Sequence, residues 1–206
     1  MSGKRVSEDR RREQILEAAC QVALAQRLSG LSTRAVAAKA GVSNGLVFFY
    51  FRSRRELLLA LLEWLLAKTI LRRGGESGAA PESAYSRLSA EVQGALDRLQ
   101  HDRTRIELFF DFWFMGTRDD VIRNRIREAL KRHRDSYLPL AQAVVAEQPA
   151  RFPGVTGESL ADIAASFIEG CALRLVADPR NWDLKANSRA LAAILSPACK
   201  LDTPEK

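Results

Sequence analysis

The stretch LSTRAVAAKAGVSNGLVFFYF, residues 31–51, decides the fold of the first part of the chain. Near its start, either Ser32 or Thr33 can cap a short helix over residues 33–40, because a side-chain oxygen accepts hydrogen bonds from the unpaired N–H groups of a first turn. Apolar residues then recur at helical spacing and give this helix one face to bury. The stretch therefore opens with a short amphipathic helix.

A sharp turn and a second short helix follow. Gly41 permits the left-handed backbone conformation that ends a helix, and Ser43 can cap the next one over residues 44–50. Val47 and Phe51 lie on the inward side of this second helix. Two short helices that cross through a tight glycine turn form a helix-turn-helix, whose second helix is exposed enough to enter the major groove of DNA.

A longer helix comes next, over residues 53–72. Ser53 and Glu56 have the spacing of a capping box, which pairs two unsatisfied backbone donors with side-chain acceptors at a helix start. The free N–H groups of this helix start, together with Arg54, are placed where a DNA phosphate would lie. The pattern predicts a contact that positions the protein on the DNA backbone.

The positive charge of the chain is concentrated in its first third. The chain carries 32 Lys and Arg, 25 Asp and Glu, and a net charge of +7. Residues 1–73 hold 14 basic and 6 acidic side chains, a net charge of +8, whereas residues 74–206 hold 18 and 19, a net charge of −1. Basic residues confined to one segment predict a polyanionic partner. They do not line one face of a single amphipathic helix, which argues against a membrane surface.

Length and composition indicate a small head joined to a larger body. With 206 residues and 47% hydrophobic content, most of the chain can bury a core. No apolar run approaches the ~20 residues that cross a bilayer, and residues 1–12 lack the apolar stretch of a signal peptide. We expect a cytoplasmic protein without a membrane partner.

The cysteines and histidines show no metal or catalytic spacing. Cys20, Cys171 and Cys199 are far apart, and they predict reduced thiols that are buried or half-buried. His101 and His133 are the only histidines, and the basic run around His133 indicates a solvated face. Because no Cys/His pair and no glycine-rich phosphate loop is present, we expect no enzyme, no cofactor and no metal.

Nearly every segment has helical periodicity, which predicts an all-α fold. Pro139 falls inside the seventh expected helix and should kink or split it. The glycine- and proline-rich segment 74–81 predicts a linker. We expect a helix-turn-helix DNA-binding head over 1–52 with three helices, a connecting helix over 53–73, and a helical ligand-binding and dimerisation domain over 74–206. The expected helices span residues 10–26, 33–40, 44–50, 53–72, 83–100, 103–116, 119–147, 157–177 and 184–199.

The head resembles the tetracycline-repressor (TetR) family over about 50 residues. The resemblance is specific because several spaced elements fall in register, and it implies a first helix packed behind two DNA-contacting helices. The matching elements are REQILEAA (12–19), LSTR (31–34), AGVS (40–43), YFRSR (50–54) and EL (56–57).

Carried over by position, the resemblance implies base or phosphate contact for Arg34, a groove-entering helix start at Asn44 and Gly45, and backbone contacts from Tyr50 and Arg54. The family commonly has Tyr where this chain has Phe48, and often His or Trp where it has Phe49. These two phenylalanines can fill the core or face DNA, where Phe48 could meet a thymine methyl group. The candidate DNA-contacting residues are Ser32, Thr33, Arg34, Ser43, Asn44, Gly45, Phe48, Phe49, Tyr50 and Arg54.

The body contains an aromatic run at residues 106–115, IELFFDFWFM, whose rings cannot all face one side of a helix. Some fill the core, and others can line a cavity for a small molecule. A cationic ligand with Asp111 or Glu107 as its counter-ion and a largely apolar ligand both fit the run. The run, and the later turn LRLVADP, look similar to the family branch that includes choline-responsive repressors. The candidate cavity residues are Leu88, Val92, Leu96, Phe109, Phe110, Trp113, Phe114, Ile122, Ile126 and Phe167.

The last two expected helices carry more apolar surface than one body can bury. Two such helices pairing with their symmetry mates would form a four-helix interface, and the family resemblance implies the same arrangement. The alternative is ordinary core within a monomer. The candidate interface residues are Ala161, Ala165, Ile168, Ala172, Leu191, Ile194 and Leu195.

Together these patterns predict a homodimeric DNA-binding transcriptional repressor. Its partners would be a palindromic double-stranded DNA operator and a small-molecule effector that is largely hydrophobic or cationic. The competing interpretation is a non-specific nucleoid-type DNA-binding protein without a ligand. That interpretation leaves the long aromatic-rich body without a use.

Overall fold

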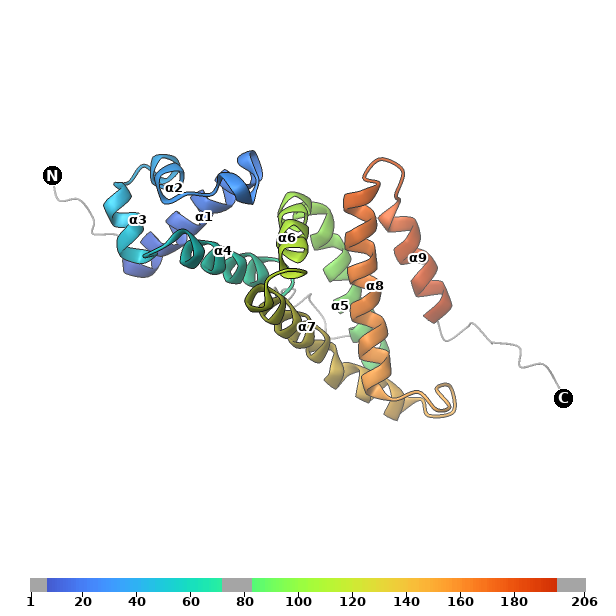
Figure 1. The fold of residues 1–206 in the computed structure, drawn as a ribbon. Helices are drawn as coiled ribbons and strands as arrows, with labels where there is room; N and C mark the ends of the chain where they lie inside the picture. The colour runs from blue at the N-terminus through green and yellow to red at the C-terminus, as the bar shows by residue number, and fades with distance from the viewer. Residues whose placement is uncertain (1–6, 72–82, 196–206) are drawn as a thin grey trace. The chain divides into compact units, whose positions relative to one another are not determined.

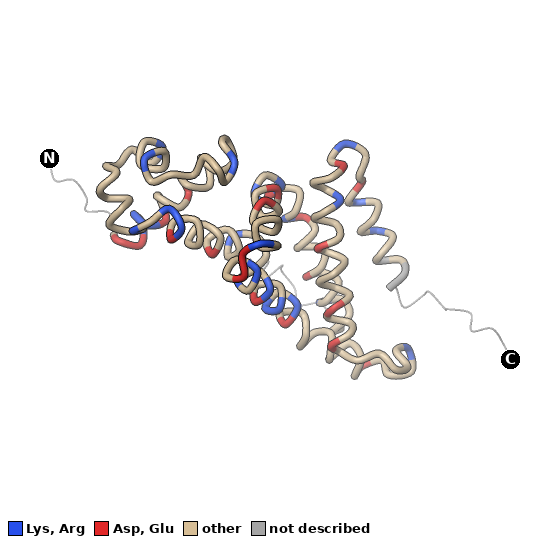
Figure 2. Tube along the Cα trace, viewed as in Figure 1, with Lys and Arg blue, Asp and Glu red and all other residues tan. Residues whose placement is uncertain are grey.

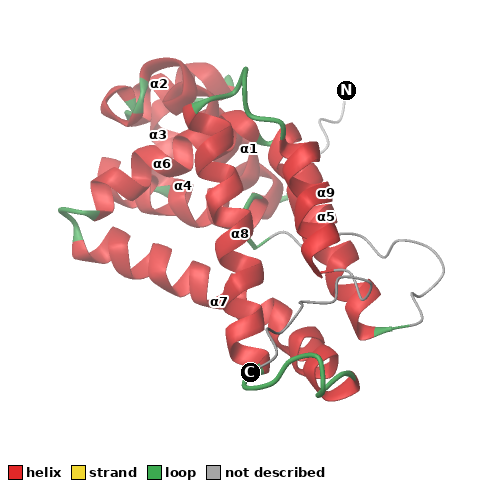
Figure 3. Cartoon of the chain, turned by 90° about the vertical axis from the view of Figure 1, so that its right-hand side faces the viewer, coloured by secondary structure: helices red, strands yellow, loops and turns green. Residues whose placement is uncertain are grey.

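The computed structural model describes residues 7–71 and 83–195, and all regular secondary structure within them is helical (Figures 1 and 3). The all-α prediction is confirmed, and the linker predicted over 74–81 lies outside the described residues. The helices are α1 (Glu8–Gln26), the short 3-10 helix η1 (Leu28–Gly30), α2 (Thr33–Ala40), α3 (Asn44–Tyr50), α4 (Arg54–Lys68), α5 (Ala84–His101), α6 (Arg103–Gly116), α7 (Asp120–Glu147), α8 (Gly157–Ala177) and α9 (Leu184–Leu195).

Helix α4 ends earlier than the sequence predicts. Its last residue is Lys68 instead of residue 72. The Thr69 hydroxyl donates a hydrogen bond to the Leu65 carbonyl oxygen at 2.7 Å, and the Thr69 N–H reaches the same carbonyl at 3.0 Å. A threonine side chain that bonds the carbonyl four residues before it competes with the backbone hydrogen bonds of a further helical turn.

The chain folds into two compact units, and each is built from two separate segments. Of the described residues, those before 72 and those from Thr104 to Arg132 form unit 1. Those from 83 to Arg103 and from His133 onward form unit 2. Helix α7 runs through both without a break, so Pro139 lies inside a continuous helix and does not split it. This is a division of packing, and the functional boundaries at residues 52 and 73 stay a prediction.

Unit 1 places α6 and the first half of α7 in the same core as the N-terminal helices. The buried side chains of α1, α4, α6 and α7 form one apolar cluster. Leu61 of α4, Phe112 of α6 and Ile122 of α7 have no exposed surface. Burial of this kind is the main favourable term in folding, and it holds the head together. Its fully buried side chains include Ile15, Leu16, Leu31, Val36, Val47, Phe51, Leu57, Leu61, Leu65, Leu108 and Phe112.

Unit 2 has its own core, built by α5, the second half of α7, α8 and α9. Helix α5 packs against both α8 and α9. Small residues of α8, among them Ala161 and Ala165, are buried there together with Leu96 of α5 and Val144 of α7. Alanines on the inward face let the helix backbones approach closely.

The cysteines lie where the sequence predicts, as far as they are described. Cys20 in unit 1 and Cys171 in unit 2 are free and buried. Burial raises the pKa of both thiols, so the reactive thiolate form is disfavoured in each. Cys199 lies outside the described residues. Among the helices that the structure describes, none is long and apolar enough to span a bilayer.

Candidate DNA-binding surface and ligand cavity

The predicted helix-turn-helix forms with the caps that the sequence suggests. Ser32 accepts a hydrogen bond from the Ala35 N–H at 3.2 Å, and Ser43 accepts one from the Leu46 N–H at 3.2 Å. Between them, Gly41 adopts the left-handed conformation, with φ 65° and ψ 35°. The turn between α2 and α3 is therefore fixed by two serine hydroxyls and one glycine.

Helix α1 fastens the end of α2 from behind. The Gln14 side-chain amide donates a hydrogen bond to the Ala40 carbonyl oxygen at 2.9 Å, at the last residue of α2. The Arg11 guanidinium in turn donates to the Gln14 side-chain oxygen at 2.8 Å. A carbonyl at a helix end has no partner within its own helix, so this bond both satisfies it and orients α2.

Helix α3 presents an exposed face that carries no charge. Asn44 and Gly45 are exposed, and Phe48 and Phe49 keep 55% and 69% of their surface in solvent. The opposite residue, Val47, is fully buried. The structure thus places both phenylalanines on the surface and not in the core, and their contact with DNA stays a prediction.

The other candidate DNA-contacting residues lie around this face. Arg34 is exposed on α2, whereas Ser32 and Thr33 are half-buried at its start. Tyr50 is half-buried, and its ring meets Phe49 edge to face with the centroids 5.4 Å apart. Figure 2 shows α3 free of Lys and Arg, with basic residues on α2 and at the start of α4 on either side of it.

Arg54 is held by the protein's own backbone. Its guanidinium donates hydrogen bonds to the carbonyl oxygens of Leu31 at 2.7 Å, Leu28 at 2.7 Å and Ser29 at 3.3 Å. These carbonyls belong to η1 and the residue that follows it, directly before α2. In the structure Arg54 therefore fixes the segment that leads into α2, and its predicted phosphate contact stays a prediction.

The predicted capping box at the start of α4 forms, but one of its two hydrogen bonds involves the residue before the cap. Ser53 accepts a hydrogen bond from the Glu56 N–H at 3.0 Å, as predicted. The Glu56 carboxylate reaches back to the N–H of Arg52 at 3.0 Å, one residue before the cap. The negative side chain lies near the positive end of the helix dipole, which stabilises the start of α4.

Two ion pairs join α4 to the start of α7, and sequence reasoning did not find them. The Arg55 guanidinium donates two hydrogen bonds to the Asp119 carboxylate, at 2.8 and 3.3 Å, and Arg125 pairs with Glu63 at 2.7 Å. Asp119 also accepts from the N–H groups of Val121 and Ile122, so it caps α7. Arg55 and these N–H groups lower the pKa of Asp119. The partners lie 64 residues apart in the first pair and 62 in the second, so no local sequence pattern predicts these pairs.

The aromatic run of α6 packs in unit 1, where some of its rings fill the core as expected, and its role in a ligand cavity stays a prediction. Phe109 is buried in the unit 1 core together with Ile122 and Ile126 of α7. Phe110 is half-buried, and Trp113 and Phe114 are exposed. Asp111, a predicted counter-ion, pairs with Arg27 at 3.5 Å.

Unit 2 contains a cavity of about 60 Å³ between α5, α7, α8 and α9. Three predicted cavity residues line it, namely Leu88, Val92 and Phe167. A fourth, Leu96, is almost fully buried in the unit 2 core. The complete lining comprises Tyr85, Leu88, Ser89, Val92, Gln93, Val144, Phe152, Leu160, Ile163, Ala164, Phe167, Ser188 and Leu191.

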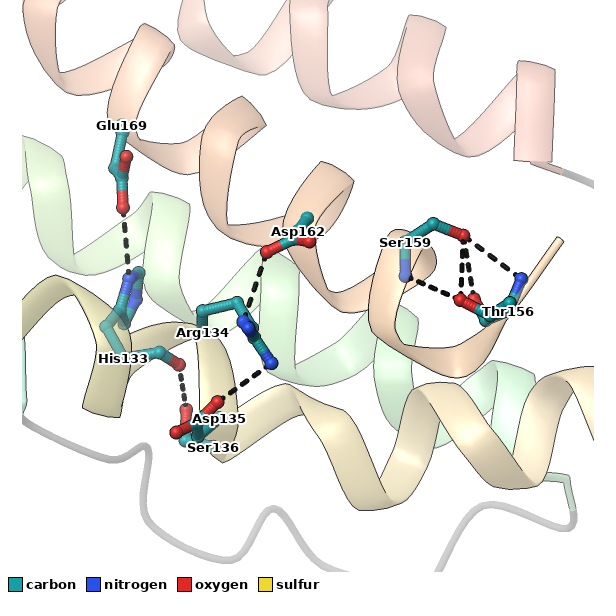
Figure 4. Close-up of polar contacts among 8 residues, drawn as sticks. All are labelled: His133, Arg134, Asp135, Ser136, Thr156, Ser159, Asp162 and Glu169. Atoms are coloured by element: carbon teal, nitrogen blue, oxygen red, sulfur yellow. Dashed lines mark hydrogen bonds and ion pairs between the residues drawn. The ribbon is translucent and has the colours of Figure 1, made fainter.

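Polar contacts connect the second half of α7 to α8 within unit 2 (Figure 4). Arg134 pairs with Asp162 at 3.1 Å, and His133 Nδ1 lies 3.7 Å from the Glu169 carboxylate. His133 is buried, and its ring meets that of Tyr137 edge to face. The prediction of a solvated face at His133 is wrong, because the imidazole turns inward while its basic neighbours stay outside.

Figure 4 also shows how α8 starts. Thr156 and Ser159 form a reciprocal capping box, in which each side-chain oxygen accepts a hydrogen bond from the other's backbone N–H, at 3.2 and 3.1 Å. This box pairs two backbone N–H groups that have no partner within the helix, and it stabilises the first turn of α8.

Three of the predicted interface residues on α8 are buried within the protomer. Ala161, Ala165 and Ile168 are buried in the protomer's own core, so a second copy cannot reach them. Ala172 and Leu191 are half-buried, and the side chains of Ile194 and Leu195 lie outside the described part. The large apolar side chains that α8 exposes are Ile163, at 57%, and Leu173, at 53%.

Comparison with known proteins agrees with this architecture. Residues 15–61 match the bacterial regulatory proteins of the tetR family, and residues 84–199, more than half of the chain, match the C-terminal part of BetI-type transcriptional repressors. The HTH-type transcriptional regulator BetI of Burkholderia thailandensis is 27% identical over 176 residues, which cover 85% of this chain and 87% of that protein.

Two further comparisons extend the likeness. The BetI regulator of Pectobacterium carotovorum subsp. carotovorum is 31% identical over 104 residues, 50% of this chain, and the match spans only 53% of that relative. The crystal structure of a TetR transcription regulator from Haloarcula marismortui superposes with a TM-score of 0.69 at 18% identity. That superposition covers 90% of this chain and 95% of the other, and it shows a shared fold.

Proposed function

Because the chain belongs to the TetR family of bacterial transcriptional regulators, with a C-terminal part of the BetI repressor type, we propose that it is a homodimeric repressor released from or fixed on its operator by a small molecule. The observation that carries the proposal is the exposed face of α3. Four residues of this short helix are exposed, and two of them are phenylalanines, whereas Val47 on its other side is fully buried in the core of unit 1. A monomeric soluble protein has no folding reason to expose two adjacent phenylalanines.

The chemistry of that face suits the major groove. The Asn44 amide can make paired hydrogen bonds with an adenine, and a phenylalanine ring can contact the methyl group of a thymine. Arg34 on α2 and the basic residues at the start of α4 supply the phosphate contacts that set position and orientation. Phosphate contacts carry no sequence information, so we assign specificity to α3.

The exposed face of α8 supports the dimer. Ile163 and Leu173 are exposed there, and an added Cβ at Gly170 would meet nothing within 4 Å. Positions 163, 170 and 173 fall within one third of a helical turn's circumference, so they form one stripe. Pairing of this stripe with its symmetry mate would bury it and set two heads about one DNA turn, ~34 Å, apart.

The ligand would act on the separation of the two heads. A small molecule shifts the protein between two states only by its difference in affinity for them. In unit 1, the ion pairs Arg55–Asp119 and Arg125–Glu63 and the shared apolar core join α4 to the start of α7. A change transmitted along α7 would therefore reach α4 and the head.

The proposal is tested by removing the two DNA-contacting side chains that the fold does not use. We expect the double variant Arg34→Ala, Asn44→Ala to bind its operator about 100-fold more weakly, since each base or phosphate contact contributes about 1–3 kcal/mol. Fluorescence anisotropy with the DNA upstream of its own gene gives the affinity. The matched control is Arg118→Ala, which removes the same charge from an exposed position outside α2 and α3.

The outcomes separate the two readings of the basic head. An unchanged affinity in the double variant would contradict the assignment to α2 and α3. Equal binding of operator and scrambled duplex by the wild type would favour a non-specific nucleoid-type protein. A normal melting temperature in both variants shows that the fold is intact.

A further inference from the structure

The cavity of unit 2 is small, lined mainly by apolar side chains and partly open to solvent, since one lining residue, Ile163, is 57% exposed. Its volume is about 60 Å³, well below the roughly 150 Å³ of an engineered apolar cavity that binds benzene. Aliphatic and aromatic side chains from α5, α8 and the segment before α8 form most of its wall. A ligand that fits within it has only a few non-hydrogen atoms and a mainly apolar body.

One end of the cavity is polar without being charged. The Ser188 hydroxyl of α9 donates a hydrogen bond to the Gln93 side-chain oxygen of α5. The Gln93 amide in turn donates to the Asp97 carboxylate at 3.0 Å. The Ser188 hydroxyl therefore uses its hydrogen on Gln93, and the Gln93 amide donates to Asp97 and not to Ser188. The Ser188 oxygen keeps lone pairs that can accept a hydrogen bond from a ligand. Ser188 is only 8% exposed, so a ligand donor that reaches it is shielded from water.

No lining residue of this cavity carries a charge. The Arg151 guanidinium lies over the rings of two lining residues, Tyr85 and Phe152, 5.7 and 5.3 Å from their centroids. A cationic ligand would have to compete with Arg151 for these two ring faces, and it would find no carboxylate in the wall. A carboxylate ligand would lose its hydration without a charged donor in the wall, which is costly.

These observations decide between the cationic and the apolar effector that the sequence leaves open. We infer that the cavity takes a small uncharged molecule with an apolar body and one hydrogen-bond donor, a hydroxyl or amine-type N–H, which it directs to Ser188. The inference rests on the proposed function for its regulatory meaning, but the binding itself does not. Asp111, the earlier candidate for a counter-ion, is paired with Arg27 and does not line the cavity.

Three probes of matched size test the charge preference: 1-butanol, butylammonium and butyrate. Each is titrated into the full-length protein, and amide chemical shifts are followed by NMR at pH 7. We expect 1-butanol to shift residues of the cavity wall and to bind at least about tenfold more tightly than either ion. Tighter binding of butylammonium or butyrate, binding elsewhere on the protein, or no binding of any probe would overturn the inference.

Two variants and one control locate the site. Ala164→Phe fills the cavity and should abolish the 1-butanol shifts, whereas Ala90→Phe adds the same ring at an exposed position of α5 that does not line the cavity and should leave them unchanged. Ser188→Ala should weaken 1-butanol binding about fivefold, because it removes one hydrogen bond worth about 1 kcal/mol. This second variant keeps the test valid if Ala164→Phe fails to fold, and unchanged binding in it would contradict the assigned polar end.

The ligand experiment and the DNA experiment can fail independently of each other. If the wild type binds its operator and no neutral probe enters the cavity, the ligand class is wrong and the regulator assignment stands. If a neutral probe enters the cavity and the protein ignores duplex DNA, the proposed function fails and the binding site remains.

Discussion

The two proposed binding sites, the exposed face of α3 and the cavity of unit 2, differ in how tightly the protein packs around them. The proposed DNA-binding face is backed by a tightly packed core, in which Val47 and Phe51 are almost completely buried. The cavity is a place where the unit 2 core does not close, between helices distant in the sequence. A surface that must match a rigid duplex needs a rigid support, whereas a site that must admit and release a small molecule needs incomplete packing.

The largest expected effect compares a phenylalanine from each region. Phe51→Ala should lower the free energy of unfolding by about 3–5 kcal/mol, since it leaves a void in a full core. Phe167→Ala, at the half-buried wall of the cavity, should cost only about 1–2 kcal/mol. Urea denaturation of both variants measures the difference. Equal losses would mean that the cavity wall is packed as tightly as the head.

The next effect concerns the proposed dimer, which would set the spacing of its two DNA-binding faces. Leu173→Glu places a charge on the exposed stripe of α8, and we expect the protein to become monomeric because burying an unpaired carboxylate at an interface is costly. Sedimentation velocity gives the oligomeric state. The control Glu17→Gln changes a charge at an exposed position of α1 and should leave it unchanged. A dimeric L173E variant would place the interface elsewhere.

A smaller effect tests how the head is held. Arg54→Met removes three hydrogen bonds from a guanidinium to backbone carbonyls and should destabilise the protein by about 1–2 kcal/mol, the side chain being partly solvated. Thermal unfolding at low and high salt measures it. If Arg54 acts only on phosphate, R54M keeps the wild-type stability and loses DNA affinity alone.

The two glycines of the helix-turn-helix should respond in opposite directions. Gly41→Ala should cost about 1 kcal/mol, because its φ of 65° lies in the left-handed region that disfavours a side chain. Gly45→Ala should stabilise the fold by about 0.5–1 kcal/mol, because Gly45 is helical and uncrowded, with only the Ser43 oxygen 4.0 Å from an added Cβ. Yet we expect G45A to bind DNA more weakly. A variant that gains stability without losing affinity would remove Gly45 from the DNA contact.

The smallest effect is the pH dependence of the Arg55–Asp119 pair. The pKa of Asp119 is lowered in the folded protein by Arg55 and by the N–H groups at the start of α7. A lowered pKa contributes stability above the unfolded value of about 3.9, and this contribution is lost as the pH falls through the folded value. The melting temperature of the wild type should therefore exceed that of Asp119→Asn at pH 7 and approach it near pH 3. A constant difference across this range would contradict the pairing.

The same contrast between regions explains what the sequence could predict. The head follows local rules, since a serine caps the turn beside it and a glycine ends the helix before it, so the bounds of α2 and α3 and the turn at Gly41 are confirmed. The surface position of Phe48 and Phe49 needed the structure, because their spacing fits either side of α3.

The cavity depends on which helices meet, and no local pattern contains that information. The aromatic run of α6 predicts a cavity, but Phe109 and Phe112 pack into unit 1 because Thr104–Arg132 folds with the head. Residues such as Ser188 and Phe152, which line the cavity, carry no sequence signal of their own. For α8, the sequence shows that the helix is apolar but not which of its faces packs inward. The predicted interface therefore includes Ala161 and Ile168, which the protomer's own core buries.

The most direct test of the account is the affinity of the purified full-length protein for the duplex upstream of its own gene, measured by fluorescence anisotropy against a scrambled duplex of equal length at two salt concentrations. We predict a dimer that prefers its own sequence by at least about 1,000-fold and whose affinity falls steeply with salt. A monomer that ignores both duplexes at low salt would contradict the account.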